Sequence, residues 1–328
     1  MGEREGRLET WIAHQEDRGE TAAAAMGRTL LDQIGDLPLS QKPSAGADRS
    51  PITQEETKIT PEFVRRIMGK DFIRPDTVRM AVGREVKPAQ LSRLLEPLDL
   101  EMLLRIKELG GFLSLRTDRA GDGSPLTAQW MHQHLEQKLV DDGKGKIFYN
   151  TDWYNRHGFF RNEAARYGED GLALVLVTKD VVKGTTKRNY ADQTVALADF
   201  LKDQVYASRQ LPDVYQEAID EFMGQREELT NLQYSDWKKA AIRLSELPLN
   251  ILTRGIFAER IYDSSVYLAQ NDERLLPNTW DWTRSRTSDD RLVYVGDSVA
   301  SGAYVDGWYP DGSDPGLGVC ASLIVSQI

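Results

Sequence analysis

The sequence predicts an α+β protein in which a helical N-terminal region precedes a domain of short strands, two or more helices and long glycine-rich loops. Apolar residues between Ile59 and Leu268 recur mainly at helical spacing, with a few short β-branched runs between them. After Asn271 the chain consists of short strand-like segments separated by turns, with six glycines in residues 296–318. Loops of this kind, held on a rigid scaffold, are where binding usually resides.

The expected helices are marked by their caps and by their apolar spacing. Thr60 followed by Pro61 places a cap residue before a proline at the first helical position, and this helix should continue through Met68. Gly83 and the pair Gly110-Gly111 should end later helices, because glycine commonly follows the last helical turn. By the same criteria we expect helices at 75–82, 87–95, 100–109, 126–140, 192–206, 212–232, 237–244 and 256–268.

The expected strands are short. Residues 112–116 (FLSLR) alternate between apolar and polar types, and residues 172–178 (LALVLVT) form a brief, β-branched run typical of a buried strand. Residues 147–150 are a third candidate. The Trp280-Asp281-Trp282 alternation places both indoles on one face of a strand, and Leu292 begins the next strand.

Composition divides the chain into three parts. Residues 1–57 should be a flexible tail and linker, since they offer little apolar surface and include the proline- and glycine-containing stretch 37–48. Residues 58–145 should form a mainly helical N-terminal domain. Residues 146–328 should form the C-terminal domain, with displayed loops at 296–318.

Charge and cysteine content exclude several classes of protein. The 328 residues contain 41 Lys and Arg against 51 Asp and Glu, a net charge of −10, so we expect no nucleic-acid partner. No apolar run approaches the roughly 20 residues of a membrane helix, and the N-terminus lacks a secretory signal, so we expect no membrane insertion. Cys320 is the single cysteine. It cannot form an intrachain disulfide, and its apolar surroundings predict a buried side chain.

No catalytic or cofactor motif stands out. The chain has no nucleophile elbow, no paired-histidine metal motif and no phosphate-binding glycine loop, and we expect no cofactor and no metal. His132 and His134 face different sides of a helix, and His157 lies in a polar loop. Calcium is the alternative for the aspartates at 297, 306, 311 and 314, but their spacing fits no EF-hand and Asp-Gly pairs are turn chemistry.

The C-terminal block resembles a known family. Residues 276–283 (LPNTWDWT), 293–298 (VYVGDS) and 317–319 (LGV) are similar to the closing block of C-type-lectin-fold proteins. They are closest to the sulfatase-modifying-factor branch and to the variable proteins diversified by diversity-generating retroelements. Residues 295–298 stand where that family has Arg-Gly-Gly-Ser, and residues 318–320 where it has Gly-Phe-Arg. The similar part covers about fifty residues.

This resemblance implies a C-type-lectin-like domain over residues 146–328 and a diversified surface in its loops. Retroelements of this type randomise adenines in Asn codons, which cannot produce Lys, Glu, Gln, Met or Trp. These five types make up about a fifth of the chain, yet Trp308 is their only representative in residues 292–318. Turn-rich loops also avoid such residues, so this deficit has two explanations.

Our leading hypothesis is a non-enzymatic protein that binds a protein or cell-surface ligand through these loops. Scaffold positions would be Trp280, Trp282, Trp308, Gly296 and Gly318. The contact surface would comprise Asp297, Ser298, Val299, Ser301, Tyr304, Asp306, Tyr309, Asp311 and Ser313, since Tyr, Ser and Asp give contact area and adaptable hydrogen bonding.

Two alternatives belong to other classes. One is an oxidoreductase of the formylglycine-generating type, whose cysteine or copper chemistry a single cysteine in an apolar run does not support. The other is a structural or assembly protein of a phage or mobile element whose helices oligomerise. A cytoplasmic or virion-associated location is expected in each case.

The linker composition generates a first prediction. Limited proteolysis of the full chain should cut between Leu37 and Lys58, because exposed polar segments with few apolar anchors are the preferred cleavage sites. A resistant fragment that begins near Ile59 should remain, and mass spectrometry of the digest would identify it. Protection of residues 37–58 would instead show that they pack against the rest of the protein.

Overall fold

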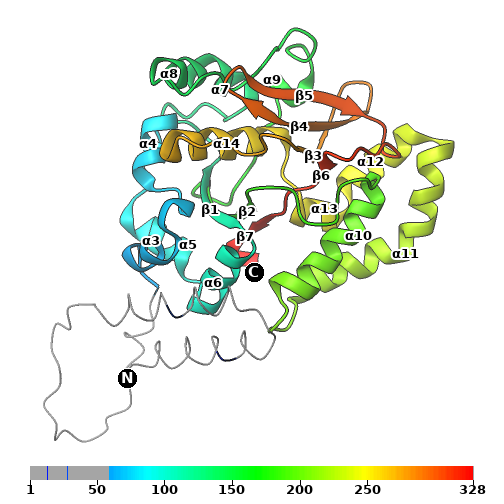
Figure 1. Cartoon of the computed structure of the whole chain (residues 1–328), viewed down its shortest axis with the longest axis horizontal. Coiled ribbons are helices and arrows are strands. Elements are labelled where there is room, and N and C mark those ends of the chain that lie inside the picture. Colours follow the sequence, from blue (N-terminus) through cyan, green and yellow to red (C-terminus); the bar gives the residue numbers. More distant parts are fainter. Residues whose placement is uncertain (1–12, 14–27, 29–58, 328) are drawn as a thin grey trace, which may run out of the picture.

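The computed structural model describes residues 59–327, together with Ala13 and Arg28. The expected flexible tail, residues 1–57, therefore lies almost entirely outside the described residues. Within them, two small sheets lie on either side of one central helix, and the remaining helices surround this unit (Figure 1).

Four short helices begin the described chain where their caps predict. Thr60 caps the first of them, since the amide of Phe63 donates to its hydroxyl over 3.2 Å, and Asp99 accepts from Met102 in the same way over 2.8 Å. Proline occupies the first turn of the first three helices. The helices are α3 (Pro61–Met68), α4 (Pro75–Val82), α5 (Pro88–Leu95) and α6 (Leu100–Glu108).

The first sheet joins distant parts of the chain. It has the order β1 (Gly111–Thr117), β2 (Leu172–Thr178), β7 (Ser322–Ile324), with both pairs antiparallel. The strand predictions at 112–116 and 172–178 are confirmed. Because β1 pairs along its whole length with β2, and one hydrophobic core extends from Ile59 to Val325, the boundary expected near residue 146 does not divide the core.

Further helices lie between β1 and β3 along the chain. The single helix expected at 126–140 is interrupted at Leu135, and the helix expected at 192–206 ends in a π-helical turn over Leu201–Val205. Two helices of six residues or fewer, α9 and α13, were not predicted. The elements are α7 (Ala128–His134), α8 (Glu136–Asp141), α9 (Gly158–Arg161), α10 (Tyr190–Phe200), α11 (Asp213–Ser235), α12 (Trp237–Glu246) and α13 (Pro248–Thr253).

The second sheet contains most of the C-terminal block. Its order is β5 (Gly302–Trp308), β4 (Leu292–Val299), β3 (Trp280–Arg286), β6 (Leu317–Gly318). The pairs β5–β4 and β4–β3 are antiparallel, whereas β6 runs parallel to β3.

The prediction of a strand at 147–150 is wrong, because this segment makes only one isolated bridge, between Phe148 and Ala303. The segment instead covers the open edge of β5. The amide of Ala303 donates to the carbonyl of Ile147 over 2.8 Å, and the indole Nε1 of Trp153 donates to the carbonyl of Val305 over 3.2 Å. A covered edge is protected from pairing with another chain.

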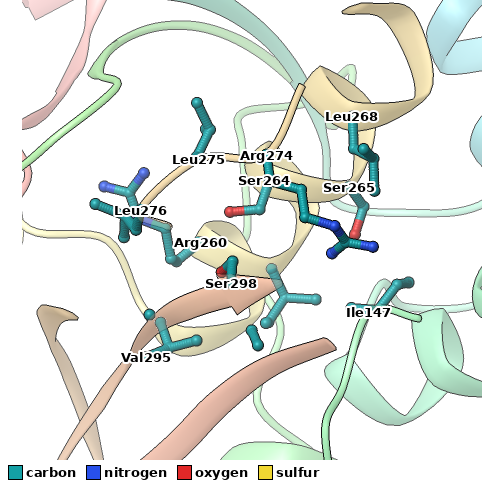
Figure 2. A pocket seen from close by; sticks show the side chains of 13 residues that line it. Ile147, Arg260, Ser264, Ser265, Leu268, Arg274, Leu275, Leu276, Val295 and Ser298 are labelled. Atoms are coloured by element: carbon teal, nitrogen blue, oxygen red, sulfur yellow. The ribbon is translucent and has the colours of Figure 1, made fainter. Parts of the chain in front are cut away.

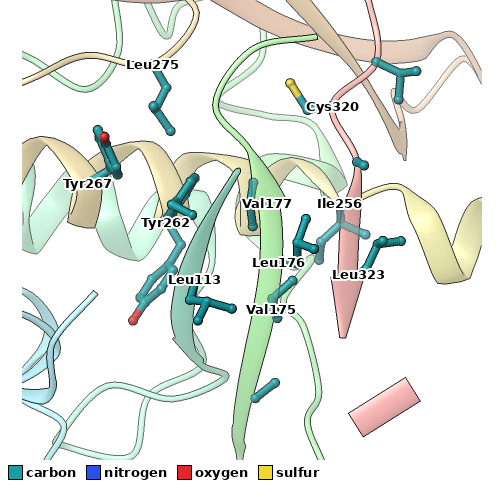
Figure 3. Packing of buried hydrophobic residues seen from close by; sticks show 14 of the residues in the cluster. Leu113, Val175, Leu176, Val177, Ile256, Tyr262, Tyr267, Leu275, Cys320 and Leu323 are labelled. Carbon is teal, nitrogen blue, oxygen red and sulfur yellow. The ribbon is translucent and has the colours of Figure 1, made fainter. Parts of the chain in front are cut away.

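Helix α14 (Phe257–Asn271) lies between the two sheets and contacts both (Figure 1). Apolar side chains from α14, β1, β2 and β7 pack beneath it, including Tyr262, Leu113 and Leu323 (Figure 3). Tyr262 and Leu113 are at most 3% exposed. This side of α14 therefore closes the core above the first sheet.

Buried ionic contacts also attach α14 to each sheet. In the first sheet Arg116 of β1 bonds Asp263, with 2.5 Å between Nη2 and Oδ2, and lies 3.0 Å from Glu259. In the second sheet Asp281 of β3 accepts from Arg260 Nε over 2.7 Å. The other oxygen of Asp281 accepts from the amide of Cys320 over 2.7 Å. The charged side chains of one helix are thus paired on both sides.

The carboxyl group of the half-buried Glu163 fastens the segment after α9 to β3. Glu163 accepts a hydrogen bond from the hydroxyl of Ser285, and that hydroxyl accepts from the amide of Phe257 over 2.7 Å. Burial raises the pKa of Glu163 to about 7, which the Ser285 bond and the positive charge of Arg284 only partly oppose. Glu163 therefore binds a proton more tightly in the folded protein than in the unfolded chain.

We expect Asp281→Ala to lower the free energy of unfolding by about 3–5 kcal/mol, because it leaves the Arg260 charge buried and unpaired. Chemical denaturation would measure the loss. The matched control is Glu228→Ala, which removes the partner of Arg243 in a largely exposed pair and should leave the free energy nearly unchanged. Equal effects of the two substitutions would contradict the role given to the buried pair.

A pH dependence follows from Glu163. Since its folded pKa is raised, its contribution to stability should decline as pH rises from about 4.5 to about 7 and stay low above that, with a total of up to about 3 kcal/mol. Glu163→Gln keeps the shape without the titration, so it should be more stable than the parent at pH 8 and similar to it at pH 5. Denaturant titrations at both pH values test this. A variant that loses stability equally at both would show that the glutamate is favourably ionised.

Candidate functional site

The outer face of the second sheet carries the candidate site. Along β4 and β5, Val293, Val295 and Val305 point into the core and are at most 3% exposed. The alternate residues point outward, so Tyr304 is 41% exposed and its neighbour Asp306 is half-buried. Tyr304 and Asp306 thus lie on β5, so this part of residues 296–318 is a strand and not one of the expected displayed loops.

Glycines fix this segment against the rest of the protein. A Cβ added at Gly296 would lie 2.0 Å from the carbonyl oxygen of Thr279, and one added at Gly302 would lie 2.2 Å from the carbonyl carbon of Phe148. At Gly318 it would lie 2.7 Å from the side chain of Val181. These positions admit only glycine because another part of the chain approaches closely. Gly296 and Gly318 therefore act as scaffold, as expected.

Three tryptophans support the outer face, one of them fully buried and two half-buried. Trp282 is fully buried and its ring packs edge-on against Tyr190 of α10, 5.2 Å between centroids. Trp280 and Trp308 are half-buried, so the expectation that Trp308 is a buried anchor is only partly met. Loop glycines lie directly on these two rings: a Cβ at Gly316 would be 2.6 Å from Trp280, and one at Gly312 would be 2.9 Å from Trp308.

The loop 309–316 is tied down at both ends. The carbonyl of Pro310 accepts from the amide of Tyr190 over 3.0 Å, and the carbonyl of Asp314 accepts from the amide of Lys187 over 3.0 Å. Just before the first tie, Tyr309 is 44% exposed and its ring meets Trp237 edge-on, with 4.7 Å between ring centroids. The loop is therefore a fixed extension of the sheet surface toward α12.

The structure brings eight of the nine expected contact residues to this surface. Ser298 is the exception: it is 7% exposed and its side chain faces the interior, because the strand register shifts between Gly296 and Val299. Asp306 is half-buried. The exposed residues are Asp297, Val299, Ser301, Tyr304, Tyr309, Asp311 and Ser313.

An open groove of about 680 Å³ borders Tyr304 and Asp306, and its other wall consists of residues that sequence reasoning missed. The missed residues come from the segment after α8 and from the β3–β4 hairpin, and no local pattern marks them. They are Trp153, Arg156, His157, Ser288, Asp289 and Arg291.

His157 joins the two segments that form this second wall. Its Nδ1 lies 2.9 Å from the hydroxyl of Ser288 and accepts from the amide of the same residue over 3.2 Å. Burial lowers the pKa of His157, which keeps the ring neutral and able to accept. Arg291 bonds Asp289 over 3.1 Å, so the groove presents both charges.

The side chains of the described residues do not converge into a set of metal ligands. Within residues 59–327, together with Ala13 and Arg28, no three His, Cys, Asp or Glu residues converge as ligands would. Cys320 is 1% exposed, which confirms its expected burial, and this burial raises the pKa of its thiol well above the usual range. A neutral, enclosed thiol is a poor nucleophile.

Comparison with protein families, curated proteins and solved structures finds no match to this chain. Across the described residues, the helices are too short or too polar to span a bilayer.

Scaffold and surface should respond differently to substitution. Trp282→Ala should cost about 3–5 kcal/mol, as large aromatic truncations in a core do. Replacement of Tyr304, Asp306, Tyr309 and Asp311 together by Ser should change stability by no more than about 0.5 kcal/mol per position, because these side chains face solvent. The melting temperatures of both variants, compared with that of the parent protein, would test this division into scaffold and surface. A quadruple variant that fails to fold while Trp282→Ala folds normally would contradict the assignment.

Proposed function

We propose that this protein is a non-enzymatic binding protein that presents exchangeable side chains on a C-type-lectin-like scaffold. One observation carries the proposal. In residues 296–318, exposed side chains are interleaved with glycines at which a Cβ would lie within 3.0 Å of backbone, of an indole ring or of another side chain. Such a segment can change its surface chemistry without changing its path.

The sheet behind the surface supports this division. The inner residues of β4 and β5 belong to the hydrophobic core that also contains α14. On the outer side Tyr294 and Trp308 are half-buried and pack against this core, whereas Tyr304 is exposed. Exposed substitutions usually alter stability little, so the exposed outer positions are free to vary. Fixed backbone also lowers the entropy lost on binding.

The order of elements agrees with the family resemblance. The tryptophan-containing strand is β3, the strand with the Val-Gly-Asp-Ser sequence is β4, and the last short strand is β6. The segment that corresponds to the diversified loop contains β5 and residues 309–316. This correspondence supports a C-type-lectin-like arrangement for the C-terminal block.

The distribution of residue types supports diversification by a retroelement. All nine expected contact residues are Asp, Ser, Val or Tyr, which randomised Asn codons can encode. Trp308, the one residue in 292–318 that such codons cannot encode, is also the half-buried ring on which Gly312 rests. The exception therefore lies at a scaffold position.

The exposed aromatic residues favour a protein ligand. Tyrosine and tryptophan commonly supply the binding hot spots of protein interfaces. Tyr304 lies in β5, and Tyr309, whose ring contacts Trp237, follows the end of this strand. The two tyrosines are five residues apart, which is about 17 Å at 3.3 Å per residue. A single small molecule would not reach both, whereas a protein surface would. The enclosed, neutral thiol of Cys320 supports the non-enzymatic reading over formylglycine-type chemistry.

Two display libraries would test the proposal. The first randomises the seven exposed contact positions and Asp306 with codons ending in C, and the second randomises Gly296, Gly302, Gly316 and Gly318 in the same way. Most members of the first library should resist protease, and hen egg lysozyme, used as a model protein target, should select binders from it. The glycine library should be largely unfolded. Equal protease resistance, or a first library without binders, would contradict the proposal.

The coding locus gives an independent test of diversification. We expect a reverse transcriptase gene and a near-copy of the 3′ coding end beside it. Among isolates, substitutions should concentrate in the exposed codons of 297–313 and avoid the glycines. Substitutions spread evenly over the chain would contradict diversification. The protein would then be a binding protein with a constant surface, or the alternative, an assembly protein whose helices oligomerise. Light scattering on the full chain would identify that alternative.

A further inference from the structure

A small cavity lies directly beneath the β4–β5 hairpin, on the inner side of the second sheet (Figure 2). Its walls come from α14, from the segment 274–276 and from β4 and β5. The cavity measures about 20 Å³. One water-sized occupant needs roughly 10–15 Å³, so the space holds a single water or monoatomic ion and excludes sulfate or phosphate.

Several hydrogen-bond donors at this cavity have no acceptor among the described residues. The Nη1 of Arg260 and the hydroxyl of Ser265 are buried and unpartnered, and both residues are at most 3% exposed. The inward-facing hydroxyl of Ser298 also forms no hydrogen bond with a described residue. In the view of Figure 2 the hydroxyls of Ser264 and Ser298 lie between the guanidinium groups of Arg260 and Arg274. Buried donors without partners are costly, which indicates an occupant that accepts.

The charges around the cavity favour an anion over water. Arg260 is neutralised by Asp281, but Arg274 forms no ion pair with any described carboxylate and bonds only the carbonyls of Lys144 and Lys146. The lining contains no Asp or Glu. The nearest acidic residues in sequence are otherwise engaged, since Asp272 pairs with Lys144 and Glu273 with Lys70.

We propose that this cavity binds a buried halide, with chloride as the physiological ion. The ion would accept from the unpartnered hydroxyl and guanidinium donors and would balance the charge of Arg274. It would thereby fasten α14 to the hairpin whose outer side carries Asp297, Val299 and Ser301. This inference is independent of the proposed function, since it concerns the support of the hairpin and not its ligand.

Crystals of the full chain grown with sodium bromide would test the site. An anomalous bromide peak is expected between Ser298 and the Arg274 guanidinium. Thermal unfolding supplies the second measurement: the melting temperature should be higher in sodium chloride than in sodium gluconate at equal ionic strength, because a ligand of the native state stabilises it. This chloride dependence should disappear in Arg274→Gln and remain in the surface control Arg243→Gln.

The measured quantity is the difference in melting temperature between sodium chloride and sodium gluconate. A general loss of stability in Arg274→Gln lowers both melting temperatures and therefore does not obscure this difference. If that variant does not fold, Ser265→Ala combined with Ser298→Ala replaces it and should also abolish the chloride dependence. Ordinary water density with no anomalous peak would overturn the proposal. A bromide peak without any chloride dependence of the melting temperature would mark an adventitious ion only and would overturn it equally.

Discussion

The fold depends on the ionic contacts that attach α14 to both sheets. Arg116 and Asp263 join the helix to the first sheet, and Arg260 and Asp281 join it to the second. All four side chains are at most 4% exposed. Hydrophobic packing alone is non-directional, whereas each of these contacts requires a particular rotation and position of the helix. The sheets are therefore placed relative to each other through one element.

This constraint explains how the C-terminal block can be both rich in glycine and fixed. Asp281 also accepts from the amide of Cys320, so the chain after β6 returns to the same ionic centre. The hairpin of β4 and β5 is held behind by the core and at its edge by Ile147 and Trp153. Its outer face carries the exposed Tyr304, which is among the residues proposed to bind, beside the half-buried Trp308 that supports the loop.

Local signals in the sequence predicted the local features of the fold. Helices with a cap residue or an initial proline, such as those at Thr60 and Asp99, begin where the sequence indicates, because capping is determined within one turn. The short β-branched run at 172–178 likewise predicted a strand with the bounds that the structure shows. Gly296 and Gly318, expected as scaffold, are closely approached by the backbone of Thr279 and by the side chains of Val181 and Thr185, respectively.

What sequence reasoning missed depends on contacts between distant residues. The side chain of Ser298 faces inward because the strand register shifts between Gly296 and Val299. No residue type in this segment predicts that shift. Trp153 and His157 reach the groove only because the segment before them covers the edge of β5, more than 140 residues further along the chain. The pairing of β1 with β2 across the boundary expected near residue 146 is another such contact, because it joins strands more than 50 residues apart.

The central claim is that the displayed side chains stand on a scaffold as stable as the core. Native-state hydrogen exchange measures this most directly, because it gives the free energy of opening for each backbone amide. The account predicts that the amides of β3 and β4 exchange only through global unfolding, with the same free energy as those of α14. Amides of β3 and β4 that exchange through local opening, at a much lower free energy than α14, would contradict it.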